Sequence, residues 1–385
     1  MVRVVVLGQG LVATHLMVGV ERIKKGELEP IGVPLAKYEV EVPIEDIEFV
    51  ASYDVDPGKV GKSVYDVAEE MLGSLLPVPA TLKSVKVRRG IHAGSLKGLV
   101  EGARGLDEEA GMWGAVEAIA GELEELEPDV IINVITTEEA RPYNTPQELV
   151  EALKKGEASA SHAYAYATYL YMARTGRKVA LVNGIPAPLA NDKTILTLYE
   201  RAGGLVFGDD GATGATPLTA DLLEHLAERN RRVLSIAQFN IGGNMDFLAL
   251  TLPEKNKMKE FTKSSVVEDI LGYDAPHYIK PTGYLEPLGD KKFVSMHIWW
   301  KTFNGLEDEL VVNMRINDSP ALAGLLVDLI RISKSLLDRG YRGTVYEVNA
   351  FFMKKPGPPG SRNVARVIAY HNLLNMLRKL EIVRS

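Results

Sequence analysis

Short apolar runs alternate with amphipathic segments along the first half of the chain. Apart from Arg3, every residue from Val2 to Leu7 is β-branched or apolar, which is typical of a strand buried on both faces of a parallel sheet. A helical pattern follows as far as about Lys25, and Ile47 to Tyr53 has the pattern of the next strand. This order predicts the first strand–helix–strand unit of an α/β fold.

Similar units follow up to residue 241. The expected helices are Val64 to Leu72, Trp113 to Glu127 and Ala158 to Met172. The expected strands are Asp129 to Asn133, Lys178 to Val182, Gly204 to Phe207 and Arg232 to Ala237. Several of these strands end in polar, glycine-rich loops, so we expect a doubly wound parallel sheet with a binding site along one edge. Thr136 follows one of these strands and is a candidate at that edge.

The pattern changes after residue 246. Two long alternating segments, Lys292 to Trp300 and Glu309 to Ile316, predict antiparallel strands of a second, smaller sheet domain that covers the site. The chain then returns to a helix from Pro320 to Arg339 and to a strand-like run from Tyr346 to Met353. A last helical segment, Arg362 to Arg378, is expected to pack back on the first domain.

Composition narrows the classes of function. The chain has 385 residues, of which 46% are apolar, so it can form two domains with substantial cores. With 44 basic and 51 acidic residues and no long run of one sign, nothing indicates binding to nucleic acid or a membrane surface. The absence of cysteine excludes disulfides and sulfur-based zinc sites. Because the N-terminus reaches glycine too early for a signal peptide and no apolar segment is long enough to span a bilayer, we expect a cytoplasmic protein.

A glycine-rich turn joins the first strand to the first helix. It consists of Gly8, Gln9, Gly10, Leu11, Val12 and Ala13, a Gly-x-Gly-x-x-Ala pattern. In this position the pattern is typical of dinucleotide binding, with the pyrophosphate on the amides at the start of the helix, although such glycines can also merely end a strand. Asp54, at the end of the second strand, is expected to accept hydrogen bonds from the adenosine ribose and so to favour NAD over NADP; Asp56 is a competing candidate.

Residues 208–269 carry an unusual density of glycine, acids, carboxamides and lysines. Lys259 and Lys263 lie four apart, which on a helix places both amines on one face, suited to a phosphate or an oxyanion or simply exposed to solvent. Lys301 directly follows an apolar strand, where desolvation would lower its pKa or the side chain would extend to water. By default Asp318 is a helix cap, and Asp328, in an apolar helix, needs a cationic partner if it is buried.

Some reaction classes find no support in the sequence. The seven histidines show no metal-binding spacing, and there is neither a nucleophile elbow nor a Walker loop. Acyl transfer and nucleotide hydrolysis are therefore disfavoured.

In their order along the chain, the polar motifs resemble those of the myo-inositol-1-phosphate synthases in their shorter archaeal and actinobacterial form. The motifs are Gly208-Asp209-Asp210-Gly-Ala-Thr, Gln238-Phe-Asn240-Ile-Gly-Gly-Asn-Met-Asp246, Lys259-x-x-x-Lys263, Lys301, Asn317-Asp318-Ser-Pro, Asp328 and Phe-Phe-Met-Lys354. The resemblance is dense from residue 208 to 354 and looser from 31 to 150. The nucleotide loop departs from the more glycine-rich family version at Gln9 and Leu11.

The resemblance implies an NAD-dependent isomerase that converts D-glucose 6-phosphate to myo-inositol 1-phosphate, also numbered as the 3-phosphate. Bound NAD+ takes hydride from C5, the ketone acidifies C6, the C6 enolate attacks the C1 aldehyde, and the hydride returns to C5. The product would serve inositol or phospholipid biosynthesis. A Rossmann domain of residues 1–241 plus 319–385, a domain of residues 242–318 for catalysis and tetramerisation, and a homotetramer are implied as well.

The resemblance also assigns roles to residues. The implied catalytic residues are Lys259, Lys263, Lys301, Lys354, Asp318 and Asn240. The implied cofactor-binding residues are Gly8, Gly10, Leu11, Val12, Ala13, Asp54, Thr136, Asp210, Asp246 and Asp328. The sequence names no metal ligand, and a divalent or monovalent cation stays open. Two other functions remain: an NAD-dependent dehydrogenase of another phosphorylated sugar or an aldehyde, and a non-catalytic NAD-binding paralogue.

Overall fold

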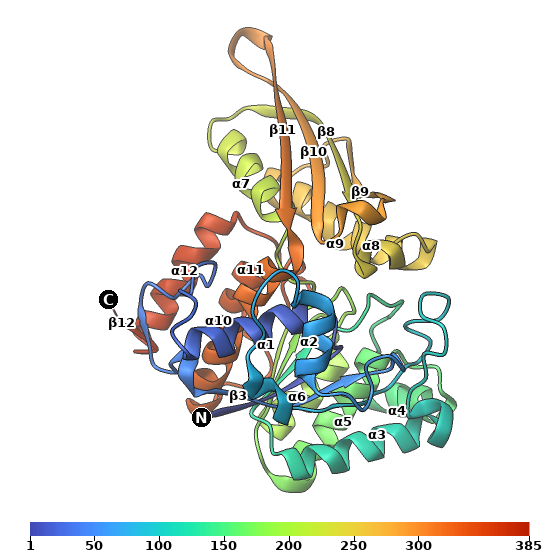
Figure 1. The fold of residues 1–385 in the computed structure, drawn as a ribbon. Helices are drawn as coiled ribbons and strands as arrows, with labels where there is room; N and C mark the ends of the chain where they lie inside the picture. The colour runs from blue at the N-terminus through green and yellow to red at the C-terminus, as the bar shows by residue number, and fades with distance from the viewer. Residues whose placement is uncertain (385) are drawn as a thin grey trace.

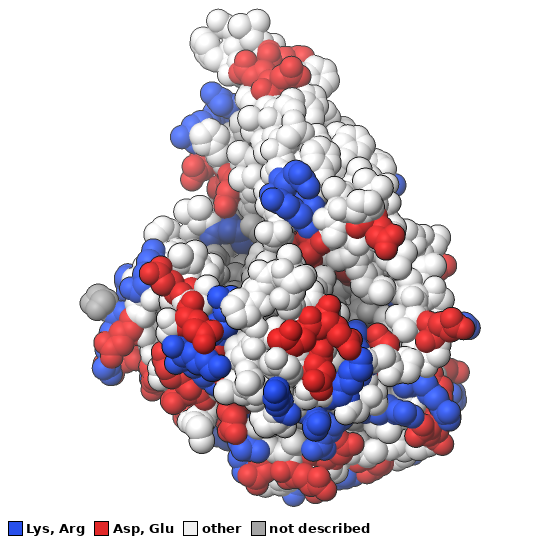
Figure 2. All heavy atoms as spheres, viewed as in Figure 1, with Lys and Arg blue, Asp and Glu red and all other residues white. Residues whose placement is uncertain are grey.

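The protein consists of a parallel-sheet part and a second part built on a mixed sheet, which stands above it in Figure 1. The computed structural model describes residues 1–384, and side chains for residues 1–257 and 265–384. No helix in this described part of the chain has an apolar stretch long enough to cross a membrane. Figure 2 shows acidic and basic side chains intermixed over the lower part and a hollow between the two parts.

A six-stranded sheet forms the centre of the first part. Its strands, in spatial order, are β4 (Val87–Arg89), β3 (Ile47–Asp54), β1 (Val2–Leu7), β5 (Val130–Asn133), β6 (Ala180–Asn183) and β7 (Leu205–Phe207). All neighbouring strands are parallel. The chain reverses its direction of winding at β1, so a crevice for ligands is expected outside the carboxyl ends of β1, β3 and β5. This is the predicted doubly wound, Rossmann-like sheet.

Helices cover both faces of this sheet. One face carries α1 (Leu11–Lys24), α2 (Val64–Leu72), α10 (Asp318–Asp338), α11 (Tyr346–Phe352) and α12 (Arg366–Lys379). The other carries α3 (Asp107–Leu126), α4 (Pro146–Lys155), α5 (Ala160–Thr175) and α6 (Lys193–Ala202). Strand β1 contributes side chains to both hydrophobic cores: Val4 and Val6 pack on the first face of the sheet, and Val5 and Leu7 pack on the second. The continuous apolar pattern of this strand is therefore explained by burial on both sides.

The second part is a four-stranded mixed sheet. Its strands, in spatial order, are β11 (Glu307–Asn317), β10 (Lys291–Lys301), β8 (Arg232–Gly242) and β9 (His277–Tyr284). Helices α7 (Thr216–Ala227) and α9 (Pro253–Leu271) cover one face, and α8 (Met245–Ala249) follows β8. The β10–β11 hairpin extends away from the parallel sheet (Figure 1).

Short elements complete the chain. Strands β2 (Glu39–Val40) and β12 (Val383–Arg384) pair with each other and fix the C-terminal end beside the loop after α1. The 3₁₀ turns are Ile44–Asp46, Ala80–Ser84, Glu286–Leu288 and Phe303–Gly305.

Two sequence predictions differ from the structure. Strand β8 belongs to the mixed sheet, and α7 packs on that sheet, so the division between the two parts falls near residue 214 and not at 241. Residues 346–352 form helix α11 where a strand was expected. The hydrophobic pattern cannot distinguish which sheet a strand such as β8 joins, or whether a short buried run such as residues 346–352 is helical.

Candidate active site

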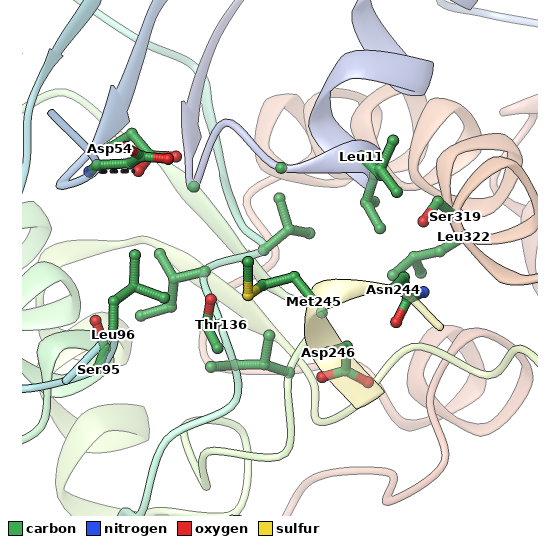
Figure 3. A pocket seen from close by; sticks show the side chains of 18 of the residues that line it. Leu11, Asp54, Ser95, Leu96, Thr136, Asn244, Met245, Asp246, Ser319 and Leu322 are labelled. Atoms are coloured by element: carbon green, nitrogen blue, oxygen red, sulfur yellow. Dashed lines mark hydrogen bonds between the residues drawn. The ribbon is translucent and has the colours of Figure 1, made fainter. Parts of the chain in front are cut away.

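A pocket of about 340 Å³ lies at the carboxyl edge of the parallel sheet, beneath the mixed-sheet part. The glycine-rich turn, the end of β3 and the loop after β5 line it from below. Asn244, Met245 and Asp246, at the start of α8, line it from the other side, as Figure 3 shows. Residues of both parts therefore line one pocket, and the volume of this pocket is within the range of known ligand-binding pockets.

The glycine-rich turn has the geometry that a dinucleotide requires. Gly8 has a positive φ of +93°, and a Cβ there would lie 2.7 Å from Val134 O and Ile135 Cα, so only glycine fits between β1 and β5. A Cβ on Gly10 would meet no atom within 4 Å, which leaves its backbone open to a ligand. Helix α1 begins at Leu11 without a side-chain cap, and Gly10, Leu11 and Val12 line the pocket, so the start of this helix can bind an anion.

The predicted nucleotide residues are nearly all in this pocket. The lining includes Gly8, Gly10, Leu11, Val12, Asp54, Thr136, Asp210 and Asp246, together with the competing candidate Asp56. Ala13 does not line the pocket; it is fully buried against the sheet, where its small side chain permits close packing of α1.

Asp54 connects the end of β3 to the glycine-rich turn. Its carboxylate accepts hydrogen bonds from the amides of Gln9 (2.8 Å), Val55 (2.8 Å) and Asp56 (2.9 Å). Lys59 lies 3.4 Å from Asp54 and 3.5 Å from Asp56. The end of the pocket beside β3 therefore contains two acids and one lysine, Lys59, which the sequence pattern does not indicate.

Lys354 and Asp210 form a buried ion pair at the pocket wall. Lys354 Nζ lies 3.0 Å from Asp210 Oδ1, and the side chains are 6% and 1% exposed. The Lys354 amide also donates to the carbonyl of Asp210 (2.6 Å), so the loop after β7 runs alongside the end of α11. These two predicted residues therefore lie side by side in the wall of one pocket.

A second ion pair, between the buried Lys292 and the half-buried Asp318, stands next to the pocket. Lys292 Nζ lies 3.1 Å from Asp318 Oδ2, and Asp318 lines the pocket. A Cβ on Gly214, whose φ is +74°, would lie 2.6 Å from Lys292 Nζ, so the backbone there must be glycine for the amine to keep its place. Lys292 was missed by the sequence analysis.

Strand periodicity could have identified Lys292. Residues 292, 294, 296, 298 and 300 of β10 are all buried, so Lys292 lies on the buried face of the strand. Lys301 lies on the exposed face of the strand and does not line the pocket. Its register partners in the neighbouring strands are Arg232 of β8 and Glu307 of β11. The nine residues between the two lysines span about 30 Å at the rise of a strand. The expected place of Lys301 at the site is therefore wrong, whereas Lys292 lies beside the pocket, next to Asp318.

Asn240 and Asp328 are also absent from the pocket lining. Asn240 is buried in β8, where its Nδ2 donates to Lys280 O (3.1 Å) and its backbone amide to Thr282 Oγ1 (3.0 Å). Asp328 is buried in α10, accepts from the Leu35 amide (2.7 Å) and pairs with Arg331 (2.8 Å). Burial raises the pKa of Asp328 to about 6, and Arg331 opposes this effect. These contacts give both residues structural roles. Lys259 and Lys263 lie outside the residues whose side chains are described.

Asp290, in the turn before β10, holds the two parts together beside the pocket. Its carboxylate accepts from Asn244 Nδ2 (2.9 Å), and from the amide (2.9 Å) and hydroxyl (2.5 Å) of Ser319. Asn244 and Ser319 both line the pocket (Figure 3). Asp290 thereby fixes the start of α10, and with it Asp318, relative to α8. The sequence gives no periodic signal for this turn residue.

Lys255 reaches from α9 to the loop over the pocket. Its buried Nζ donates to the carbonyl of Ser95, which lines the pocket beside Leu96. Burial lowers the pKa of Lys255, and Glu138 and Asp246 oppose the shift. Asp246 in turn accepts a hydrogen bond from Thr137 Oγ1 (2.9 Å). Contacts from the mixed-sheet part thus hold loops on the edge of the parallel sheet.

Comparison with known proteins places this architecture in one family. The family model described as myo-inositol-1-phosphate synthase matches residues 214–319. The crystal structure of a myo-inositol-1-phosphate synthase-related protein from Thermotoga maritima is 52% identical, covers 98% of both chains and superposes with a TM-score of 0.92. The chain belongs to the myo-inositol-1-phosphate synthase family.

More distant members of the myo-inositol-1-phosphate synthase family agree with this assignment. Inositol-3-phosphate synthase from Corynebacterium glutamicum is 28% identical over 380 residues, which cover 95% of this chain and 96% of that protein. The structure of inositol-3-phosphate synthase from Caenorhabditis elegans shares the fold with a TM-score of 0.82 at 17% identity, covering 98% of this chain and 85% of that one. The segment matched by the family model contains both Lys292 and Asp318.

Proposed function

We propose that this chain is an inositol-phosphate synthase that converts D-glucose 6-phosphate to myo-inositol 1-phosphate with retained NAD. The observation that carries the proposal is that two buried lysines each contact a carboxylate, Lys354–Asp210 and Lys292–Asp318, beside a pocket that also holds a dinucleotide-type glycine turn. Family membership supports the same reaction. The reaction forms oxyanions, and fixed ammonium groups stabilise such charge in a site that excludes water.

The residues on the nucleotide side fit NAD. The amides at the start of α1 would hold the pyrophosphate, since Gly8 and Gly10 leave the backbone accessible. Asp54 would accept a ribose hydroxyl. When bound, NAD+ supplies the hydride chemistry at C5 of the sugar and recovers its oxidised state at the end of the cycle.

The buried lysines act on the sugar in this proposal. Lys354 Nζ, held by Asp210, would donate a hydrogen bond to the oxygen that becomes negative when the C6 proton leaves. Lys292 Nζ, held by Asp318, would stabilise the oxygen at C1 as the ring closes. Both carboxylates keep the amines in place before the reaction, so little reorganisation is required.

We also propose a homotetramer acting in the cytoplasm. The face of the mixed sheet opposite α7 and α9 exposes Phe239, Tyr278, Trp299 and Val311, which are 46%, 43%, 40% and 58% accessible. Such a broad apolar face is typical of an interface between subunits. Light scattering on a Trp299→Asp, Val311→Asp double variant tests this proposal: the variant is expected to lose the tetramer, and a tetramer that persists would contradict it.

The experiment that tests the reaction is phosphorus NMR of purified protein with glucose 6-phosphate, NAD+ and a series of cations, while absorbance reports NADH. A new inositol phosphate resonance without net NADH is expected. Net NADH with another phosphorylated product would instead identify a dehydrogenase. NAD binding without any product under all conditions would identify a non-catalytic paralogue.

A further inference from the structure

The ribose end of the pocket contains a lysine where a site selective for NAD needs only an acid. Asp54, Asp56 and Lys59 all line the pocket, and Figure 3 shows Asp54 at its edge beside the glycine-rich turn. Lys59 is bound to the two acids from a single loop, with its side chain 19% exposed. This cluster lies where position 2′ of an adenosine ribose is bound in doubly wound folds.

The acceptor capacity of Asp54 is almost fully used. A carboxylate offers about four lone-pair positions. The amides of Val55 and Asp56 occupy Oδ1, while the Gln9 amide occupies one position of Oδ2. Lys59 Nζ, at 3.4 Å from Oδ2, stands at the position that remains. A ribose hydroxyl that binds Asp54 must therefore share this oxygen with Lys59 or displace it towards Asp56.

The same lysine changes the charge that a 2′-phosphate would meet. Two carboxylates and one ammonium leave one net negative charge at this end of the pocket, whereas without Lys59 there would be two. A phosphate carries between one and two negative charges at neutral pH. Lys59 therefore weakens the repulsion that an acid at the end of this strand normally exerts on NADP.

We propose that Lys59 sets how strongly the site distinguishes NAD from its 2′-phosphorylated form, by acting as the counter-ion of Asp54 and Asp56. The inference rests on the proposed function, because it assumes that a nicotinamide dinucleotide binds here. It assigns cofactor selectivity to a lysine that the glycine motif and the strand-end acid do not include.

Titration calorimetry with NAD+ and NADP+ measures this selectivity without turnover. The quantity compared is the ratio of the Kd for NADP+ to the Kd for NAD+. Lys59→Met keeps most of the side-chain length and is expected to raise the ratio about tenfold, as one added charge at roughly 6 Å would do at a partly exposed site. Asp56→Asn, which removes one negative charge, is expected to lower it severalfold, and Lys59→Arg to leave it unchanged.

The matched control is Lys62→Met, which removes the same charge from the same loop. Lys62 Nζ lies 2.6 Å from Glu70 Oε1, and Lys62 does not line the pocket. The ratio of the Kd for NADP+ to the Kd for NAD+ in Lys62→Met is therefore expected to match that of the unaltered protein. A ratio that stays constant or falls in Lys59→Met, or that does not fall in Asp56→Asn, overturns the proposal. If the unaltered protein binds neither dinucleotide, the proposed function fails as well. If Lys59→Met does not fold, the ratios of Asp56→Asn and Lys59→Arg still test the proposal. It then requires a lower ratio in Asp56→Asn and an unchanged ratio in Lys59→Arg.

Discussion

The two ends of β10 carry lysines in opposite environments. Lys292 is buried where the strand begins, beside Asp318 and the pocket, whereas Lys301 lies at the exposed end of the hairpin. Both lysines belong to the same strand, and the sequence predicted Lys301, which follows Trp299 and Trp300, as the catalytic one. The strand face on which a lysine lies, and the end of the strand at which it lies, therefore decide its environment more than apolar neighbours do.

Replacing each lysine in turn should give the largest difference in activity between the two ends of β10. Lys292→Met is expected to lower kcat about 10³-fold, because one preorganised charge in a buried site contributes roughly that much. Lys301→Met is expected to change kcat less than twofold. Initial rates from phosphorus NMR, with NAD affinity measured alongside, provide the test. Equal losses in the two variants would show that the position along β10 does not matter.

Gly214→Ala perturbs Lys292 without removing it. The added Cβ would lie 2.6 Å from the amine and would be forced into a positive φ, so Lys292 must move away from Asp318. We expect kcat to fall about 10- to 100-fold, as misplacement of a catalytic group by about 1 Å does. Gly272→Ala is the matched control, because its φ is also positive but no atom lies within 4 Å of the new Cβ. Activity unchanged in Gly214→Ala would contradict the role of Lys292.

Lys255→Met tests whether the contact between α9 and the loop at Ser95 affects NAD binding independently of the catalytic step. Without its hydrogen bond to the Ser95 carbonyl, the loop over the pocket loses a contact with α9, and bound NAD is expected to dissociate several times faster. Stopped-flow displacement of bound NAD measures the rate. Lys257→Met, on the same helix, is the control. If NAD dissociates from Lys255→Met at the same rate as from Lys257→Met, the contact with Ser95 does not retain the cofactor.

The smallest expected effect on turnover comes from a buried pair outside the pocket, Asp328 with Arg331. Asp328→Asn should leave kcat within about twofold and should not lower the free energy of unfolding at pH 7, because burial already makes the ionised carboxylate less favourable in the folded protein than in the unfolded chain, even beside Arg331. Chemical denaturation monitored alongside activity measures both quantities. A loss of turnover in the folded variant would restore the predicted cofactor role.

The same variant tests a pH dependence. The pKa of Asp328 is about 6 in the folded protein, above its ordinary value of 3.8, so between these values the folded state binds more protons than the unfolded state. The free energy of unfolding contributed by this group therefore falls as pH rises from about 4 to about 6. Denaturation at several pH values should show this decline in the unaltered protein and a flatter profile in Asp328→Asn. Parallel profiles would exclude Asp328 as the group responsible.

The parallel-sheet part could be predicted well because its signals are local. Apolar runs gave β1, β3 and β5 nearly to the residue, and the Gly8–Gly10 turn indicated the pocket floor. The mixed sheet was harder, because β8 and β9 pair with strands distant in sequence and carry polar residues within them. Asp290 acts through contacts with Asn244 and Ser319, which lie far away in sequence, so no pattern along the chain indicates it. Lys59 contacts acids in its own loop, but the hydrophobic pattern does not single out a polar residue there.

The last helices of the chain close the first half of the fold. Leu326, Leu336, Leu373 and Leu377, from α10 and α12, pack in the same core as Val4 and Val6 of β1, and β12 pairs with a strand near residue 40. During synthesis, the part of this sheet face that α10 and α12 cover therefore stays exposed until almost the whole chain has left the ribosome. Exposed apolar surface of this kind favours aggregation. A chain truncated before α12 should consequently depend on chaperones to stay in solution, although it retains nearly every residue of the pocket.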